Sequence, residues 1–384
     1  MSQGSALQIP RFPVLGWHTF GGHGRASGAA VVDGGRTVYT SSGQAAIGLA
    51  LAALGIGPRD AVLVPTYHCL TMIAPVADCG ARPLFFPITD EGMPDLAFLE
   101  KAPLQDVRAM IAAHYFGLPR SMAEVRKFCA ARGIALIEDC AHAFFGMAGG
   151  APVGSWGDLA VASLTKFFPV PEGGCLVARD PALRLPCPAA RSFASELRAL
   201  WDCLEAGSRY GRLTGLNGAL RTLRRLARGQ RPPLPAATEA AAHERPGPAA
   251  PAGAATGVVR WVSQHARRDR IIENRRSNYA LYARLIAPLS GCRALFPVLP
   301  PHAVPYVFPL HADRPDPLYA ALRAAAAPVA RWDFRWPGTP EPAGDRGGPW
   351  SRQVLQLGCH QDMSEADVRA VVDIVRTHTD GTDR

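Results

Sequence analysis

Long apolar runs are missing from this sequence of 384 residues: no stretch approaches the roughly 18 consecutive apolar residues that a membrane-spanning helix needs. Residues 1–17 lack a basic segment followed by an apolar core, so we expect no signal peptide and a cytoplasmic protein. The nine cysteines form no C-x-x-C pair and several lie in apolar segments, which predicts free thiols and neither disulfides nor a metal site. These absences argue against the membrane, secreted and zinc-bound classes of protein.

Acidic residues are absent from one basic segment, 209–231, which carries seven arginines. This segment holds most of the net charge of +9. It is either a patch for nucleic acid or anionic lipid, or a solvated surface helix with leucines at helical spacing on its inner face. A site for a phosphate-bearing substrate is a third interpretation. We favour the surface helix and expect no binding of nucleic acid or membranes.

The composition is otherwise typical of a soluble globular enzyme, with 48% hydrophobic and 19% charged residues. Residues 1–37 are rich in glycine and irregular, which predicts an N-terminal arm. Strand and helix patterns alternate afterwards, which predicts a large α/β domain with a mainly parallel sheet over 38–256. Within it, the Pro/Ala-rich stretch 230–256 predicts a mobile loop. Residues 257–384 predict one long linking helix followed by a small α+β domain.

Two apolar runs in the large domain read as buried strands, IALIEDC and DLAVASLT. Asp139 ends the first run and Lys166 directly follows the second, at the strand ends where open sheets place their ligand crevice. Burial lowers the pKa of a lysine and makes it a better nucleophile toward carbonyls. Pyridoxal phosphate (PLP) uses such a lysine together with an Asp at its ring nitrogen. The alternative is a lysine that reaches the surface and an Asp that caps a helix.

Two other segments of the large domain are candidates for ligand binding. Ser42 and Gly43 open an Ala/Leu-rich helix, whose free N–H groups and dipole favour phosphate, although a plain helix cap without a ligand is the commoner role of such residues. Tyr67 and His68 follow a buried strand, where an aromatic or imidazole ring stacks well on a flat cofactor. A structural role is the commoner one for a lone histidine such as His68.

Nine segments, taken in order, resemble a known family: TSSGQAAIGLAL, VPTYHC, HYFGLP, LIEDCAHA, GDLAVASLTK, EGG, RRSNY, PYVFPL and LGCHQDMSEADV. The chain resembles the fold-type-I PLP-dependent aminotransferases, specifically the sugar aminotransferases of the DegT/DnrJ/EryC1/StrS family. The serine of SLTK stands three residues before the lysine instead of the usual five, which is typical of a divergent branch. The resemblance implies a seven-stranded, mainly parallel sheet in the large domain and a smaller C-terminal α+β domain.

The resemblance also implies roles for individual residues. Lys166 would form the Schiff base with the cofactor and shuttle the substrate proton, and Asp139 would pair with the pyridine nitrogen. His142, three residues after Asp139, would reach the same ring. The remaining implied cofactor contacts are Ser42, Gly43 and Ser163 at the phosphate, and His68 or Tyr67 at the ring face.

As a function, the resemblance implies transfer of an amino group from glutamate or a similar donor to a keto sugar, nucleotide-linked or sugar-like. Such enzymes act in polysaccharide or secondary-metabolite biosynthesis, and a homodimer is implied. One alternative is another PLP reaction on an amino acid. The other is a non-catalytic scaffold or nucleic-acid binder that uses the arginines of 209–231, against which the pair of Asp139 and Lys166 speaks.

Overall fold

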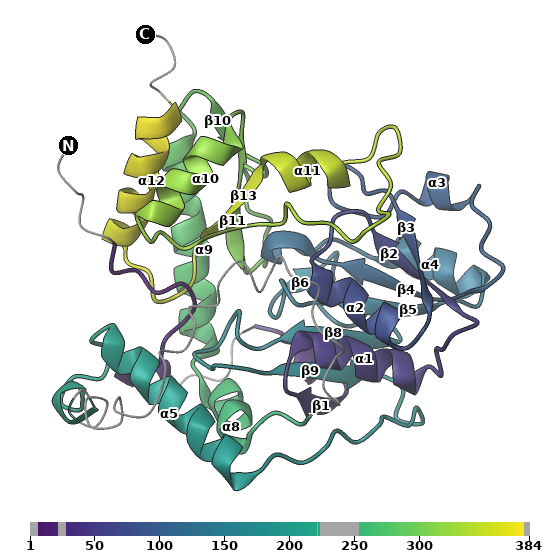
Figure 1. Cartoon of the computed structure of the whole chain (residues 1–384), viewed down its shortest axis with the longest axis horizontal. Helices are drawn as coiled ribbons and strands as arrows, with labels where there is room; N and C mark the ends of the chain where they lie inside the picture. Colours follow the sequence, from purple (N-terminus) through teal and green to yellow (C-terminus); the bar gives the residue numbers. More distant parts are fainter. Residues whose placement is uncertain (1–6, 22–27, 221, 223–252, 380–384) are drawn as a thin grey trace.

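The computed structural model describes residues 7–21, 28–220, 222 and 253–379, which form a large and a small sheet with their helices (Figure 1). The large sheet has seven strands in the order β1-β9-β8-β5-β4-β2-β3. Its strands are β1 Arg36–Thr40, β2 Ala61–Pro65, β3 Arg82–Phe86, β4 Val107–Ala113, β5 Ala135–Asp139, β8 Leu159–Ser163 and β9 Gly174–Ala178. Strand β9 runs opposite to its two neighbours, β1 and β8, and all the other neighbouring strands are parallel. The predicted mainly parallel seven-stranded sheet is therefore confirmed.

The central strands are mostly apolar because helices cover both faces of a parallel sheet. Every residue of β2, β8 and β9 is buried. The first helix packs on β8 and β9, where two fully buried alanines, Ala46 and Ala50, allow close approach. The helices of this domain are α1 Gly43–Ala53, α2 Leu70–Asp78, α3 Leu96–Leu99, α4 Ala123–Ala131, α5 Phe193–Arg209 and α8 Gly257–His265. Its short elements are β6 Met147–Ala148, β7 Ala151–Pro152, η1 Trp17–Thr19, η2 Val31–Asp33 and η3 Tyr115–Gly117.

The last third of the chain builds a second, antiparallel sheet in the order β10-β11-β13-β12, which confirms the predicted smaller α+β domain. Its strands are β10 Cys292–Ala294, β11 Val307–Ala312, β12 Val329–Arg331 and β13 Val354–Gly358. Its helices are α9 Arg268–Ile286, α10 Pro315–Ala324, α11 Gly347–Gln353 and α12 Glu365–Thr379. Figure 1 shows α9, α10 and α12 side by side against this sheet.

The expected single long helix from residue 257 is wrong, because two helices, α8 and α9, share this segment. Ala266 ends α8 in an extended conformation, with φ −65° and ψ 143°. The next N–H group, that of Arg267, donates to the carbonyl oxygen of Thr19 at 2.9 Å instead of to a helical carbonyl. A contact from the start of the chain thus accompanies the break between the two helices.

Residues 7–18 of the predicted N-terminal arm lie along the small domain. The N–H of Leu7 donates to the carbonyl oxygen of Ala325 at 2.9 Å, and the N–H of Val14 donates to Asp362 Oδ2 at 3.0 Å. The arm is therefore held by the segments that follow α10 and β13 in the small domain.

Several predictions concern segments at the limits of the structure. The stretch 230–252 of the expected mobile loop lies outside the described residues. Within the arginine-rich segment 209–231, residues 221 and 223–231 also lie outside them.

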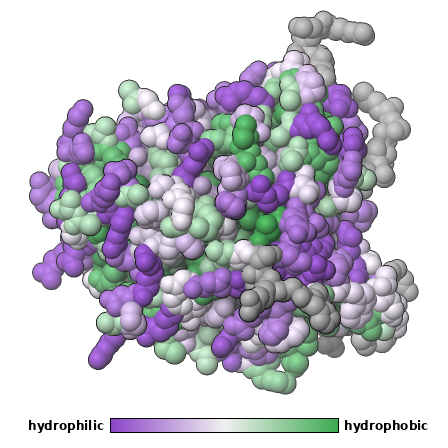
Figure 2. All heavy atoms as spheres, turned by 180° about the vertical axis from the view of Figure 1, so that it is seen from behind, coloured by the Kyte–Doolittle hydropathy of each residue, from purple (hydrophilic) through white to green (hydrophobic). Residues whose placement is uncertain are grey.

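All nine cysteines are described, and all are free thiols, as predicted. Within the described ranges, we find no helix whose length and apolar character would let it cross a membrane. The face shown in Figure 2 carries hydrophilic side chains interspersed with apolar groups near its centre.

Candidate active site

Lys166 lies in the turn that follows β8, three residues after the strand ends at Ser163. Its side chain is partly buried, and its Nζ lies 5.2 Å from the ring centroid of Tyr306. Burial lowers the pKa of the Lys166 ammonium, while Cys69 and Asp139 act in the opposite direction. The structure therefore provides a lysine whose neutral, nucleophilic form is favoured by its surroundings.

Asp139 is the last residue of β5 and faces Val161 of the neighbouring strand β8 in the register of the sheet. Its carboxylate is buried and accepts the N–H of Ala141 at 2.8 Å. Burial raises the pKa of Asp139, whereas this hydrogen bond and the charge of Lys166 lower it. The two strand ends thus bring the carboxylate and the amine into one electrostatic environment, as the sequence predicts.

The preceding residue, Glu138, is a structural carboxylate. It is fully buried, and its Oε1 lies 2.8 Å from Nε2 of the buried His114. Three backbone N–H groups also donate to it, those of Gly154, Trp156 and Gly157. Successive strand residues point to opposite faces of the sheet. Glu138 therefore binds the turn at residues 154–157 on one face, while the carboxylate of Asp139 lies on the other face.

A cradle of backbone N–H groups forms where α1 begins. Ser42 caps this helix by accepting the N–H of Ala45 at 3.1 Å, and the first N–H groups of a helix have no intrahelical partner. A Cβ added to Gly43 would lie 3.5 Å from Cβ of Ser163, so the helix start and the end of β8 are adjacent. A Cβ on Gly174 would come within 2.4 Å of the Ser42 carbonyl, so only glycine fits there. The three predicted phosphate contacts, Ser42, Gly43 and Ser163, are thus brought together.

His142 and Tyr67 belong to an aromatic cluster above these strand ends. The His142 ring lies 4.6 Å from that of Tyr306 and 4.8 Å from that of Trp332. Burial, and then the charge of Lys166, hold the pKa of His142 well below its usual range, so it is neutral. Tyr67 packs 5.0 Å from Trp332, and its hydroxyl accepts a hydrogen bond from Gln356 at 3.3 Å. Flat ligands bind well beside such rings.

His68 lies apart from this cluster. Its Nδ1 lies 2.8 Å from the carbonyl oxygen of Pro65, and its Nε2 accepts the N–H of Trp336 at 2.9 Å. Its ring packs on that of Phe85 at 5.4 Å. Of the two candidates for covering a cofactor ring, Tyr67 and His68, the structure places only Tyr67 in the aromatic cluster.

Two buried histidines, His68 and His360, should make the protein less stable in mild acid. Burial lowers the pKa of His68 and of His360 to about 4, against about 6.5 in the unfolded chain. Between these values the unfolded state binds more protons, so the free energy of unfolding falls as the pH falls from 6.5 toward 4. Each histidine should lower the free energy of unfolding by about 2 kcal/mol at pH 5. Urea unfolding of the wild type and of His68→Gln at pH 7.5 and 5 measures this; an equal pH dependence in both proteins would refute it for His68.

A buried arginine that sequence reasoning did not assign holds the lysine turn. The guanidinium of Arg275, on α9, is fully buried and donates to the carbonyl oxygen of Lys166 at 2.6 Å and to that of Pro305 at 3.0 Å. Its Nε donates to Gln361 Oε1 at 2.8 Å, and Gln361 in turn donates to the carbonyl oxygen of Phe167 at 2.7 Å. Arg275 and Gln361 thus clamp the backbone on which the reactive amine stands.

The fold and the paired lysine and carboxylate at neighbouring strand ends place the chain among the fold-type-I PLP enzymes. Within this class, the chain belongs to the DegT/DnrJ/EryC1/StrS aminotransferase family, whose sequence model matches residues 29–228. The resemblance seen in the sequence is therefore confirmed.

Individual relatives agree with this assignment. Over 179 residues, covering 45% of this chain and 48% of the relative, the sequence is 34% identical to a UDP-N-acetyl-3-dehydro-alpha-D-glucosamine 3-aminotransferase of Acidithiobacillus ferrooxidans. It is 33% identical over 155 residues, 40% of each chain, to a dTDP-4-dehydro-2,3,6-trideoxy-D-glucose 4-aminotransferase of Saccharopolyspora spinosa. The chain thus spans less than half the length of these curated relatives. The PLP form of a putative sugar aminotransferase from Streptococcus pneumoniae shares the fold, with 16% identity over 92% of this chain and 93% of that chain and a TM-score of 0.62.

Proposed function

We propose that this protein is a PLP-dependent aminotransferase that moves an amino group from glutamate or a similar donor to a keto sugar. The observation that carries the proposal is the placement of Lys166 and Asp139 at adjacent strand ends, where the charge of each acts on the other. The fold and the family support it, because both are those of aminotransferases.

The residues present fit the cofactor. The start of α1, with Ser42, Gly43 and Ser163, would hold the phosphate, since free helix N–H groups bind anions. Asp139 would hold the protonated ring nitrogen, which supplies the positive partner that its buried carboxylate needs. Lys166 would hold the aldehyde. We propose Tyr67 as the ring-face residue, because it lies within the aromatic cluster.

Bound PLP supplies an electron sink for the carbon that carries the donor's amino group. The chain's own residues supply positioning and proton transfer. Burial lowers the pKa of Lys166, which makes its amine more readily available in the neutral form and suits it to carry the proton of the substrate carbon. His142 is neutral and lies against Tyr306, so it provides a hydrogen-bonding group without adding charge.

The proposed acceptor is a keto sugar, nucleotide-linked or sugar-like, because the two curated relatives named above act on nucleotide-linked dehydro sugars. A role in polysaccharide or secondary-metabolite biosynthesis follows from such an acceptor. A cytoplasmic location stays a prediction of the sequence.

The function is tested with the purified protein and added PLP. We expect visible absorbance from the lysine-bound cofactor, and its loss on titration with L-glutamate as 2-oxoglutarate appears in equal amount. Absorbance that L-glutamate leaves unchanged would refute glutamate as the donor, and release of a product other than the keto acid would point to another PLP reaction. A protein without any such absorbance would refute the cofactor assignment.

We also propose a homodimer. One face of α5 exposes three large apolar side chains at helical spacing, with exposed fractions of 76% for Phe193, 52% for Leu197 and 42% for Leu200. We expect a dimer by light scattering, and a shift toward monomer in the double variant Phe193→Glu/Leu197→Glu. Val298→Glu, at a 77% exposed apolar residue of the small domain, is the control. A dimer equally stable in both variants would rule out this face as the interface.

A further inference from the structure

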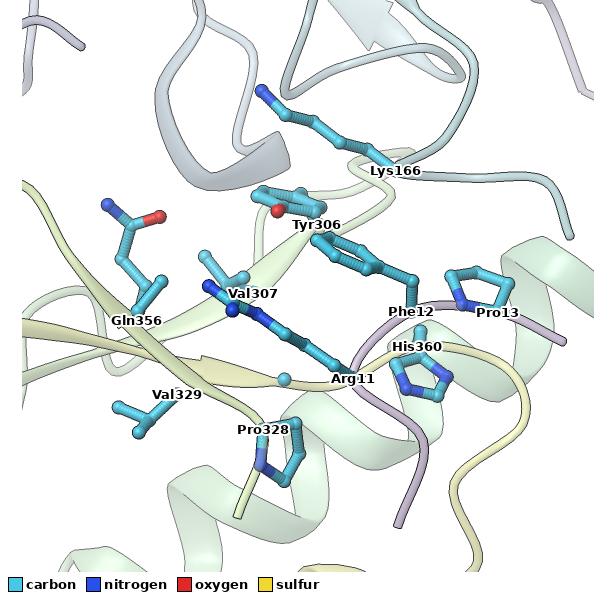
Figure 3. Close-up of a pocket in the computed structure, with 12 residues that line it drawn as sticks. Arg11, Phe12, Pro13, Lys166, Tyr306, Val307, Pro328, Val329, Gln356 and His360 are labelled. Carbon is cyan, nitrogen blue, oxygen red and sulfur yellow. The ribbon is translucent and has the colours of Figure 1, made fainter. Parts of the chain in front are cut away.

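An open pocket of about 400 Å³ lies beside Lys166 and is also lined by Tyr306, by His360 and by residues of the arm. Figure 3 shows the side chain of Lys166 and the ring of Tyr306 at one end of this pocket and His360 toward the other. Neither Tyr67 nor His142 is among the described residues that line it. Both rings are nevertheless buried, so other residues cover them.

One residue that covers these two rings is Trp332, which directly follows β12 of the small domain. Its ring centroid lies 5.0 Å from that of Tyr67 and 4.8 Å from that of His142. Trp332 begins a segment, residues 332–346, that contains neither helix nor strand. Figure 1 shows this segment in yellow-green, extending from the small domain toward the large one. Because Tyr67 and His142 are proposed to lie at the cofactor ring, the segment carries an indole ring next to the cofactor site.

Polar contacts hold this segment on two loops of the large domain, those that follow β2 and β3. In the middle of the segment, the N–H of Trp336 donates to Nε2 of His68 at 2.9 Å. At its end, Asp345 Oδ1 accepts the hydroxyl of Thr66 at 2.8 Å and the N–H of Ile88 at 2.9 Å. These contacts can break without loss of a hydrogen bond in either sheet, so the segment can move while both sheets stay intact.

The closed position of the segment leaves two buried charged groups incompletely paired. Nη1 of Arg335 and Oδ2 of Asp345 are buried and have no hydrogen-bond partner among the described residues. A buried polar atom without a partner is destabilising, and more so when its group is charged. Water reaches both atoms when the segment lifts, which removes this penalty. The closed position is thus opposed by its own unpaired atoms, as expected of an element that opens and closes.

We propose that residues 332–346 form a lid, which opens to admit ligands to the site around Lys166 and closes with Trp332 against them. This inference rests on the proposed function. Two glycines turn the chain within the lid, Gly338 with φ +83° and Gly344 with φ +85°, a conformation in which other residues are strained. Closure of the indole ring over the site excludes water from the reacting groups.

The test is hydrogen exchange of the full-length protein, followed by mass spectrometry with and without PLP. The amides of Trp336 and Arg346, which bind His68 and Ile88, report on the lid. A ligand that binds beneath the closed lid favours closure by mass action, so saturating PLP should slow their exchange at least about 10-fold. Amides of α10, in the same domain but outside the lid, should change less than about twofold. Equal slowing in both places would show general stabilisation and overturn the inference, as would unchanged exchange in the lid.

A variant of the lid anchor gives a second readout. Asp345→Ala loses the hydrogen bonds to Thr66 and Ile88, so the lid amides should exchange about 10- to 100-fold faster without PLP. PLP should also dissociate from this variant about 10- to 100-fold faster. Asp158→Ala is the matched control, because Asp158 also accepts a backbone N–H, that of Leu136 at 2.8 Å, outside the lid. Equal exchange of the lid amides in both variants would contradict the lid.

Thr66→Val is the milder variant if Asp345→Ala does not fold. It removes only the hydroxyl hydrogen bond and should speed the exchange of the lid amides about 10-fold. A wild type without cofactor absorbance refutes the proposed function. Normal absorbance, together with lid exchange that neither PLP nor Thr66→Val changes, refutes this inference alone.

Discussion

Replacing Lys166 with alanine should abolish the visible absorbance of the bound cofactor and slow amino transfer by at least about 10⁴-fold, because both the nucleophile and the proton carrier are lost. Absorbance spectra after gel filtration and 2-oxoglutarate formation measure the two effects. Lys127→Ala is the control, since Lys127 is 73% exposed in its side chain and pairs with Glu124 on the surface of α4. A Lys166→Ala protein that keeps the cofactor absorbance would contradict the assignment.

Arg275→Gln should lower the free energy of unfolding by about 3 kcal/mol or more, because it leaves several buried carbonyl oxygens without their donor. It should also lower the turnover rate, since the carbonyl of Lys166 loses its 2.6 Å hydrogen bond. Urea unfolding and the glutamate half-reaction measure the two effects.

The neighbouring Arg276 provides the control for this experiment. It donates to the carbonyl oxygens of Ala303 and Pro300, at 2.6 and 3.3 Å, which lie away from the lysine turn in sequence and hold a different loop. Arg276→Gln should therefore lower stability while leaving the rate per folded molecule unchanged. Equal rate losses in both variants would show that Arg275 acts through stability alone.

The parts of the site that the sequence predicted are those encoded locally. Asp139 is recognisable because an apolar run ends at a carboxylate, and Ser42 because a capping residue precedes helix formers. Lys166 follows the same logic, although it lies in the turn beyond the strand. Periodicity also predicted the large sheet, since strands buried on both faces are continuously apolar. It missed the break at Ala266, where the N–H of Arg267 contacts Thr19, 248 positions before Arg267 in the chain.

The residues that the sequence did not reveal meet only in the folded chain. Arg275 contacts Lys166 across 109 positions of sequence and Gln361 across 86. The sequence of the RRSNY segment does not distinguish the buried Arg275 from Arg276. Which of the two arginines holds the lysine turn depends on the residues that each one contacts in the folded chain. The same holds for His68: only the backbone of Trp336, 268 positions away, shows that its second nitrogen is occupied.

The contact between the arm and the small domain has a consequence for protein synthesis. Pro10 and Val14 bind His360 and Asp362 across 350 and 348 positions of sequence, so one wall of the pocket beside Lys166 is complete only after residues 360–362 have been translated. Every strand of the large sheet is translated long before this wall has its partner. A nascent chain can therefore display Lys166 on a finished sheet while this wall of its pocket still lacks residues 360–362.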